Sequence, residues 1–259
     1  MATLFLLLSV FSFAKNNTVL SNEKSNDKDP KKVAIITGSN RGMGLGWTKH
    51  FLNEGYTVIA TARKPEKATD LIALKKQYKK KLRIEKLDVT SEEDMAALSE
   101  TLKKKKIKID IAISNAAVTM LEDFGSWTAK GFGLNYRVNT LGAALFAQAI
   151  APYLKDGATL VQISSGAGSI TYQKKSTDLD GYRVSKAGLN MLTKLLSIRL
   201  SDRKIIVVSV QPGLVLTQMN PNGKMSVEEA VGYMSKTISN LTFENTGTFI
   251  NYKGKKFAW

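Results

Sequence analysis

Short apolar runs alternate with longer amphipathic segments along the chain from Lys32 onward. The short runs are rich in Val and Ile and are bounded by Gly, Pro or polar residues, which is typical of strands. They cover residues 33–38, 56–62, 82–89, 109–117, 158–165, 205–213 and 247–254. Because most of them are apolar at successive positions, we expect both faces of their sheet to be covered.

The segments between these runs carry apolar residues at helical spacing. Residues 91–104 open with Ser91 followed by three acidic residues, a pattern that marks a helix start. We expect helices at 44–55, 91–104, 131–154, 181–201 and 227–240, and in the lysine-rich stretch after residue 62. This strict alternation predicts one doubly wound α/β domain over residues 32–259, with a parallel sheet of about seven strands.

Residues 1–31 lack this alternation, and we exclude them from the predicted fold. An apolar run from Thr3 to Ala14 is too short to span a bilayer and ends in small residues. It predicts a cleaved signal at 1–14, with a membrane-tethering tail or a misassigned start as alternatives. Residues 15–31 are polar and predict a flexible linker. The expected localisation is export or the secretory pathway, with the cytoplasm as the alternative, and no stable membrane span is expected.

Composition narrows the possible chemistry. The 259 residues include no Cys and a single His, His50. This excludes disulfides, thiolate catalysis and Cys-ligated metals, and we predict no metal site. We expect His50 to be an ordinary surface residue of the 44–55 helix. No G-x-S-x-G motif is present, so a serine hydrolase is excluded as well.

The net charge of +16 is concentrated partly in two lysine runs, at 75–81 and 103–108. Such runs could attract nucleic acid or an anionic membrane. They are also typical of solvated faces near helix C-termini, where lysine complements the helix dipole. Neither run has interleaved aromatic residues for base stacking. We therefore favour the solvated face and predict no nucleic-acid partner.

A glycine-rich segment, TGSNRGMGLG at 37–46, follows the first strand and opens the first helix. Gly38 permits a tight turn, and Gly42 and Gly44 allow the backbone to approach a pyrophosphate at the helix N-terminus. The next strand ends Thr61-Ala62-Arg63-Lys64, with no acidic residue for a ribose hydroxyl. Arg63 and Arg41 could instead pair with a 2′-phosphate, which favours NADP(H).

Asp88 closes the third expected strand and has two interpretations. Its carboxylate could accept a hydrogen bond from the adenine amino group of a bound dinucleotide. Alternatively, it could cap the helix that begins near Ser91.

Tyr182 and Lys186 lie four apart on an expected helix, so their side chains share one face. An ammonium group beside a phenol stabilises the phenolate and lowers its pKa from about 10. Tyrosine then becomes a usable acid or base near neutral pH. Ser165 ends a strand, where its hydroxyl could donate to a developing oxyanion. Strand alternation lets only one of Ser164 and Ser165 point into such a site.

In chain order, these features resemble the short-chain dehydrogenase/reductase family, and within it the C-factor-like or sniffer-like carbonyl reductases. The motifs that carry the resemblance are TGSNRGMG (37–44), LDVT (87–90), SNAA (114–117), VNTLG (138–142), QISSGAGSI (162–170), YRVSKAGLNM (182–191), QPGLVLTQM (211–219) and GTFINYKGKKFAW (247–259). The match covers residues 32–259 and implies a Rossmann fold.

The resemblance implies NADPH-dependent reduction of a small carbonyl compound, or oxidation of the matching alcohol. Tyr182 would donate the proton, Ser165 would bind the carbonyl oxygen, Lys186 would tune Tyr182, and Asn139 would position a water. The implied cofactor-binding residues are Gly38, Ser39, Asn40, Arg41, Gly42, Met43, Gly44, Arg63, Asp88, Val89, Asn115, Ala116, Tyr182, Lys186, Pro212, Gly213, Val215 and Thr217. The family also implies a possible homodimer through the helices 131–154 and 181–201.

Two features depart from the family pattern. Ala117 stands where the family has a glycine near the cofactor, and we expect it to tighten the site. The polar loop 171–181 is long, so with residues 218–226 we expect it to form the walls of the substrate pocket. The alternative to an enzyme is a nucleotide-binding signalling or sensor protein of the C-factor type with little turnover.

Overall fold

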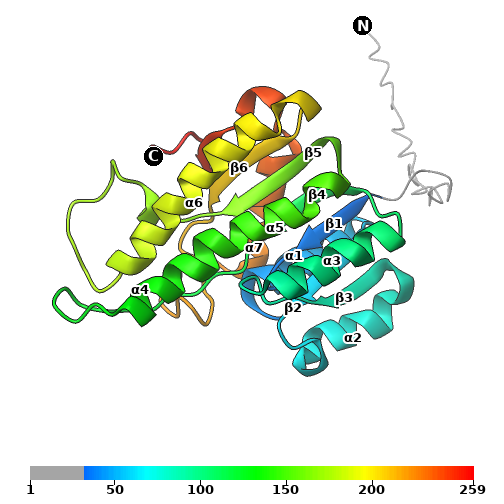
Figure 1. Ribbon diagram of the computed structural model, residues 1–259, viewed down its shortest axis with the longest axis horizontal. Helices are drawn as coiled ribbons and strands as arrows, with labels where there is room; N and C mark the ends of the chain where they lie inside the picture. Colours follow the sequence, from blue (N-terminus) through cyan, green and yellow to red (C-terminus); the bar gives the residue numbers. More distant parts are fainter. Residues whose placement is uncertain (1–31) are drawn as a thin grey trace, which may run out of the picture. The chain divides into compact units, whose positions relative to one another are not determined.

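The computed structural model describes residues 32–259 of the chain. Its centre is a seven-stranded parallel sheet with the strand order β3-β2-β1-β4-β5-β6-β7 (Figure 1). The strands are β1 (Val33–Ile36), β2 (Thr57–Ala62), β3 (Leu82–Lys86), β4 (Ile109–Ser114), β5 (Leu154–Ile163), β6 (Ile206–Gln211) and β7 (Thr248–Asn251). The predicted fold class is therefore confirmed. The predicted signal at 1–14 and linker at 15–31 lie outside the described residues.

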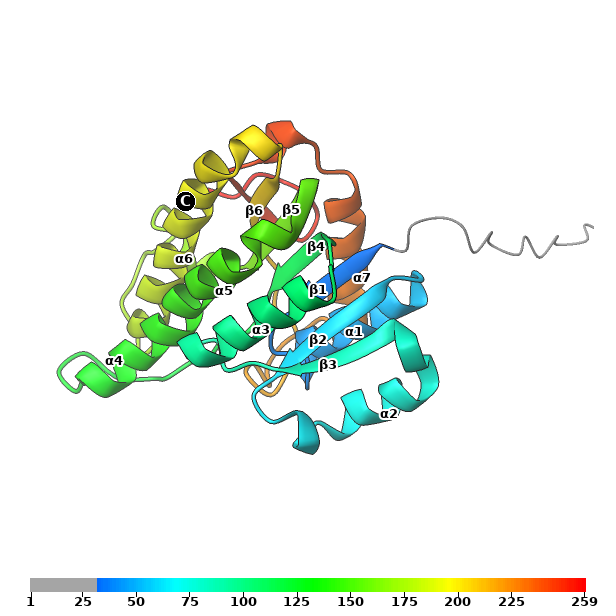
Figure 2. The same cartoon turned by 45° about the vertical axis from the view of Figure 1, so that its right-hand side comes forward.

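Helices cover both faces of the sheet, as the apolar strands predicted. One face is covered by α1 (Gly42–Asn53), α2 (Thr69–Tyr78) and α7 (Val227–Ser239). The other is covered by α3 (Glu92–Lys104), α5 (Gly142–Ile150) and α6 (Asp180–Arg199), as Figures 1 and 2 show. Alternation along each strand divides the core between the faces: Ile36 belongs to the first layer and Ile35 to the second.

The first layer corrects the expectation for His50. Its Nε2 lies 2.6 Å from the Ser235 hydroxyl on α7, and its ring packs edge-on against Trp47, which is fully buried. Burial lowers the pKa of His50 below its usual value. The residue is therefore a half-buried link between α1 and α7, and not a plain surface group. Its partner on α7 is distant in the sequence, so no local pattern could reveal this contact.

The long helix expected at 131–154 is interrupted. The structure has α4 (Ala129–Tyr136), a single π-helical turn over Arg137–Leu141, and then α5. The Gly142 amide donates to the Arg137 carbonyl five residues back, which defines this turn. Strand β5 begins earlier than predicted, at Leu154, because a short turn at Ala151–Tyr153 ends the helical region.

Because all seven strands are parallel, their carboxyl ends share one edge of the sheet. The glycine loop follows β1 at this edge, Ser165 follows β5, and the 212–226 segment follows β6. The opposite edge carries the connections that enter the strands from the helices. Within residues 32–259, no helix combines the length and apolar character needed to cross a bilayer.

Candidate active site

The glycine loop has the geometry that its sequence predicts. Gly38 and Gly42 have φ of +67° and +52°, values that side-chain-bearing residues rarely adopt. Gly44 is required for space, because a Cβ there would lie 2.1 Å from the Gly38 carbonyl oxygen. The first turn of α1 has no side-chain cap at Arg41, so its backbone N–H groups remain free for an anion.

Asn115 holds this loop from the neighbouring strand β4. Its Nδ2 donates to the carbonyls of Thr37 at 2.9 Å and Gly38 at 3.4 Å. The backbone amides of Asn115 and Ala116 both donate to the Thr37 hydroxyl at 2.9 Å. Asn115 therefore supports the cofactor loop directly. Its Nδ2 is committed to these two carbonyls, so of the side-chain amide only Oδ1 is left for the predicted contact with a cofactor.

Two residues of the predicted cofactor site turn their side chains inward. The Ser39 hydroxyl is fully buried, donates to the Ile36 carbonyl at 2.9 Å and accepts from the Thr61 amide. Val215 is buried in the core layer beneath α7. Any contact that these two residues make with a dinucleotide is restricted to their main-chain atoms. Motif matching alone does not distinguish the two kinds of contact.

A pocket of about 580 Å³ opens beside the glycine loop. Its lining includes the predicted residues Asn40, Arg41, Arg63 and Asp88, together with Ala62, Lys64, Lys67, Lys86, Ser91 and Asp94. Arg41 and Arg63 are both exposed to solvent at its rim. A pocket with this many cationic side chains suits a phosphorylated ribose.

The cap interpretation of Asp88 is wrong, because Ser91 is the N-cap of α3. The Ser91 hydroxyl accepts from the Asp94 amide at 3.1 Å. The Asp88 carboxylate instead accepts from the amide and hydroxyl of Thr90, at 2.9 and 2.8 Å. Asp94, which the sequence did not indicate, accepts from the Asp88 amide at 2.8 Å and from Lys86. The hydrogen bond from Lys86 lowers the pKa of Asp94.

Ser164 and Ser165 point in different directions, as strand alternation requires. The Ser164 hydroxyl is buried and donates to Asn190 Oδ1 at 2.7 Å. The Ser165 hydroxyl oxygen accepts from the Ala167 amide at 3.1 Å, which leaves its own proton for another acceptor. Of the two serines, Ser165 therefore matches the predicted site residue.

Tyr182 and Lys186 share one face of α6, as their spacing predicts. The Lys186 Nζ lies 5.7 Å from the centroid of the Tyr182 ring and donates to the Ile163 carbonyl at 2.9 Å. Lys186 is 2% exposed, and Gly168 makes room for it, because a Cβ at Gly168 would lie 2.8 Å from the Lys186 Cβ. The structure thus brings the lysine, the tyrosine and the end of β5 together.

The pKa values of this pair differ from the sequence-based expectation. Burial lowers the pKa of Lys186 to about 7. Burial also raises the pKa of Tyr182, and a hydrogen bond with Ser165 opposes that rise. The Tyr182 pKa is therefore raised and not lowered, contrary to the expected effect of an ammonium neighbour. Desolvation is the largest cause for both groups, and the sequence does not report burial.

Asn139 lies in the π-helical turn and is 1% exposed. Its Oδ1 accepts from the Val118 amide at 2.8 Å, and its Nδ2 donates to the Val118 carbonyl and to the Ser185 hydroxyl. Both amide protons are thereby used, so the side chain ties the segment after β4 to α6. If Asn139 binds a water as predicted, its main-chain carbonyl and not its side chain would be the group that contacts the water.

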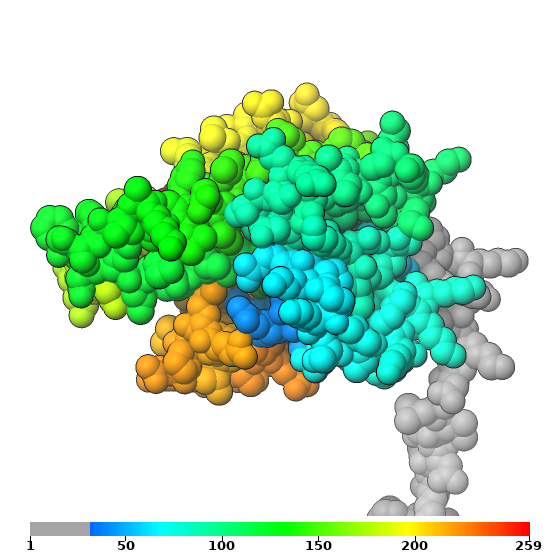
Figure 3. Space-filling view, turned by 60° about the horizontal axis from the view of Figure 1, so that its bottom comes forward, coloured from blue at the N-terminus to red at the C-terminus, as the bar shows by residue number. Residues whose placement is uncertain are grey.

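The 212–226 segment lies against the glycine loop. Gly213 has φ of +87°, and Thr217 lies beside Gly42, where a Cβ on Gly42 would meet the Thr217 Cγ2 at an ordinary van der Waals distance of 3.7 Å. Hydrogen bonds between Thr217 and Asn220 fold the segment back on itself. Figure 3 shows this segment (orange) beside the glycine loop (blue), with a hollow between it and the green arm formed by residues 118–136.

The long loop 171–181 is fastened to the turn that follows Ser165. The two protons of Gln173 Nε2 are shared among the carbonyls of Gly166, Ala167 and Ser169, at 3.3, 3.1 and 2.7 Å. The Ala167 amide is the group that donates to Ser165, so Gln173 holds the peptides that orient the serine. A lone glutamine in a polar loop gave no signal of this role in the sequence.

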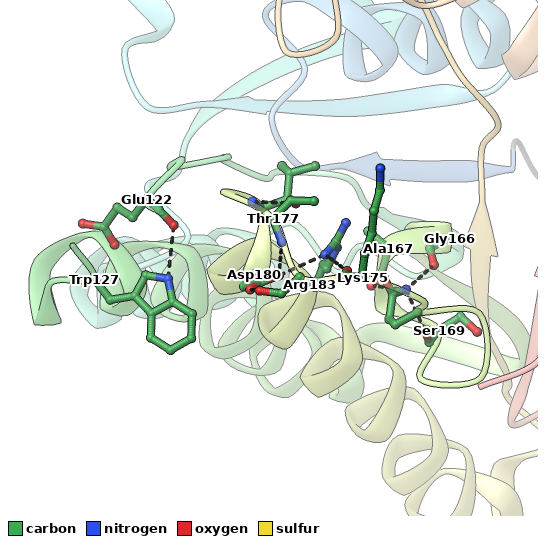
Figure 4. Close-up of polar contacts among 12 residues, drawn as sticks. Glu122, Trp127, Gly166, Ala167, Ser169, Lys175, Thr177, Asp180 and Arg183 are labelled. Atoms are coloured by element: carbon green, nitrogen blue, oxygen red, sulfur yellow. Dashed lines mark hydrogen bonds and ion pairs between the residues drawn. The ribbon is translucent and has the colours of Figure 1, made fainter. Parts of the chain in front are cut away.

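The other end of this loop is joined to α6 and to the arm. Asp180 accepts from the Thr177 amide at 3.1 Å and from Arg183 at 2.9 Å. The Glu122 amide donates to the Asp178 carbonyl at 3.0 Å. Trp127, also in the arm, donates to the Glu122 carbonyl, as Figure 4 shows. The arm and the loop are therefore linked by a backbone hydrogen bond.

Comparisons with known proteins identify the family of the chain. The family model described as short chain dehydrogenase matches residues 32–227. Carbonyl reductase from chicken fatty liver, solved with NADPH bound, superposes with a TM-score of 0.84 and 33% identity, covering 88% of this chain and 99% of that one. Carbonyl reductase Sniffer of Drosophila melanogaster superposes with a TM-score of 0.84 and 28% identity, covering 89% and 100%.

A relative from Schizosaccharomyces pombe, an uncharacterized oxidoreductase, is 33% identical over 249 residues, covering 86% of this chain and 96% of that protein. The chain therefore belongs to the short-chain dehydrogenase family, as its motifs predicted. It is an oxidoreductase of that family, and its structural neighbours are consistent with the sniffer-like subgroup.

Proposed function

We propose that the protein is an NADPH-dependent reductase of small carbonyl compounds, with Tyr182 as the proton donor. One arrangement carries this proposal: Ser165, Tyr182 and Lys186 lie together at the carboxyl edge of the sheet, where the glycine loop also lies. Only Gly fits at position 44, and the adjacent cation-rich pocket suits a phosphorylated nucleotide, so the residues present fit NADPH.

Bound NADPH would supply the hydride. The loop at Gly38–Gly44 and the N-terminus of α1 would hold its pyrophosphate, while Arg41 and Arg63 would pair with its 2′-phosphate. The solved chicken carbonyl reductase, which carries NADPH, supports this choice of cofactor. The absence of an acidic residue at the end of β2 supports it as well.

Side chains of the protein would bind the carbonyl oxygen and supply the proton. Ser165 would donate a hydrogen bond to the carbonyl oxygen and place it next to the Tyr182 hydroxyl, which gives up its proton as charge develops. Lys186 has a pKa of about 7 in the cofactor-free protein, so it is readily converted between its charged and neutral forms. A nearby anionic nucleotide favours the charged form, which in turn lowers the Tyr182 pKa.

Replacement of Tyr182 by Phe tests the proposal. Wild type should oxidise NADPH in the presence of a panel of aldehydes and ketones, whereas Tyr182→Phe should bind NADPH equally well and lose turnover by about a thousandfold or more. The measurements are NADPH absorbance and a fluorescence titration of cofactor binding. If both proteins bind NADPH alike and neither turns over any member of the panel, the signalling or sensor alternative is supported instead.

We also infer that the expected homodimer would use α6. Four large apolar side chains on this helix are 51–62% exposed: Val184, Met191, Leu195 and Ile198. Their spacing places them along one stripe of the helix. An exposed apolar stripe of this kind supports contact with a second copy. Sedimentation of wild type and Met191→Glu would measure it.

A further inference from the structure

The edge of the sheet opposite the site is covered with lysines. We call this surface the lysine edge and define it by the exposed residues Lys32, Lys79, Lys80, Lys81, Lys103, Lys104, Lys105, Lys106, Lys108 and Lys204. Lys32 directly precedes β1, and the other lysines lie at the ends of helices or between those ends and the amino ends of β3, β4 and β6. In Figure 3 the two lysine runs project (cyan and teal) on the side facing away from the green arm.

Two of these lysines occupy backbone positions that favour glycine. Lys106 and Lys204 have φ of +51° and +54°, which is strained for residues with a Cβ. Each lies in a turn at the end of a helix, of the same type as the turn that contains Gly55 after α1. In each turn, the amide of the next residue donates to a carbonyl five residues before it. These three bonds are Tyr56 to Phe51, Ile107 to Leu102 and Ile205 to Leu200. Glycine would fit each turn without strain.

The charges of the lysine edge are largely available to a partner. Within residues 32–259, the structure pairs Lys104 with Glu100 at 3.6 Å and shows no carboxylate partner for Lys79, Lys106 or Lys108. The Lys204 Nζ lies 4.8 Å from the Phe243 ring, which accounts for part of its placement. Lys79 also has a positive φ, of 47°. Lysine is therefore kept at positions where glycine would relieve backbone strain, and several of these lysines have no ion-pair partner in the described part of the chain. This combination points to a function for their charge.

We propose that the lysine edge docks on an anionic phospholipid bilayer. Lysine ammonium groups are strongly hydrated point charges that suit a diffuse layer of phosphate and carboxylate headgroups. Arg203, next to Lys204, is committed to Asp156 and to two backbone carbonyls, so this arginine is not free for bidentate recognition of bases or phosphates. Tyr56 packs against Phe51 and lies under Lys32, and Tyr78 packs against the core layer beneath α1 and α2, so neither ring is a free platform for base stacking.

Docking in this orientation would leave the candidate active site open. The glycine loop and Ser165 follow the carboxyl ends of β1 and β5, whereas the lysine edge adjoins the amino ends of the strands. The bilayer would therefore hold the enzyme without covering the cleft. This inference does not depend on the proposed function, since its readout is membrane binding and not turnover.

The test compares two variants of the full chain that lose equal charge. The first is Lys79→Gly, Lys106→Gly and Lys204→Gly, which removes charge and backbone strain together. The control is Lys130→Gly, Lys174→Gly and Lys175→Gly, which removes three exposed lysines near the arm and the 171–181 loop. Binding is measured by co-sedimentation with phosphatidylcholine vesicles, with and without phosphatidylserine, over a range of salt concentrations.

We expect wild type and control to bind the phosphatidylserine vesicles and to release them as salt rises. The lysine-edge variant should bind about tenfold or more weakly, while its thermal midpoint stays equal or rises because strain is relieved. The inference is overturned if both variants lose binding equally, or if phosphatidylserine makes no difference. Tighter salt-dependent binding to duplex RNA than to these vesicles would overturn it as well, in favour of a nucleic-acid partner.

Discussion

The two edges of the sheet use glycine for different reasons. At the carboxyl edge, Gly44 is required because any side chain would collide with the Gly38 carbonyl. At the amino edge, Gly55 has φ of +83° and nothing within 4 Å of the position its Cβ would take. At the carboxyl edge glycine is needed because there is no room for a side chain. At the amino edge glycine is favoured only because of its backbone conformation. This difference explains why lysine can replace glycine in the turns of the second edge.

The largest expected effect comes from adding one methyl group at each of these positions. Gly44→Ala should lower the free energy of unfolding by about 3 kcal/mol or more and abolish NADPH binding, because the loop must move. Gly55→Ala should lower it by only about 1–2 kcal/mol through backbone strain and leave NADPH binding unchanged. Urea unfolding and cofactor titration measure both. Equal losses of binding would contradict the division between the edges.

A second effect distinguishes Lys186 from the lysines of the opposite edge. Its pKa is lowered to about 7 by burial, so between pH 7 and its unfolded value the unfolded chain binds more protons than the folded one. Stability should therefore rise with pH across this window, by about 2–4 kcal/mol between pH 7 and 10.

Lys186→Met should remove this rise, whereas Lys106→Met, at an exposed position, should retain it. The measurement is urea unfolding at a series of pH values with cofactor absent. A slope that persists in Lys186→Met would assign the effect to another group.

The cationic pocket beside the glycine loop should determine the choice of nucleotide. Arg41→Ala combined with Arg63→Ala should weaken NADPH binding by about 10- to 100-fold and leave NADH binding nearly unchanged, because only NADPH carries the 2′-phosphate. Lys80→Ala with Lys81→Ala, at the lysine edge, is the charge-matched control and should alter neither affinity. Equal losses for both nucleotides in the arginine variant would refute the 2′-phosphate assignment.

The smallest expected effect concerns Gln173. Gln173→Met keeps the volume but loses the three donated hydrogen bonds, so the turn that orients Ser165 should loosen. We expect kcat to fall about 3- to 10-fold, with the KM for NADPH unchanged. Because the Ser165 hydrogen bond opposes the rise of the Tyr182 pKa, its loss should move the basic limb of the pH–rate profile to higher pH. Gln77→Met on α2 is the matched control. If the pH–rate profile of Gln173→Met does not shift, Gln173 only fastens the loop and does not orient Ser165.

Features carried by contiguous residues could be predicted from the sequence. Ser91 was predicted to start α3 because its side chain bonds to an amide three residues away. The glycine loop was predicted because its constraints arise within one strand, turn and helix. The spacing of Tyr182 and Lys186 fixed their shared face in the same way.

Features that depend on distant partners could not be predicted. Ser39 turns inward because it bonds to β2, and the Asn139 amide is used by Val118 and Ser185. The π-helical turn keeps helical spacing on both sides, so its apolar pattern looks continuous. The pKa values of Tyr182 and Lys186 follow from burial, which arises only when α6 packs on the sheet.

The contact between Thr217 and Gly42 has a kinetic consequence. The segment that we expect to form one wall of the substrate entrance lies beside the loop that would hold the nucleotide, so we expect coenzyme binding to fix the position of that wall. Reduction should then follow a compulsory order in which the nucleotide enters first and leaves last. Oxidised coenzyme would compete with the reduced form for the free enzyme, whereas the alcohol product would not.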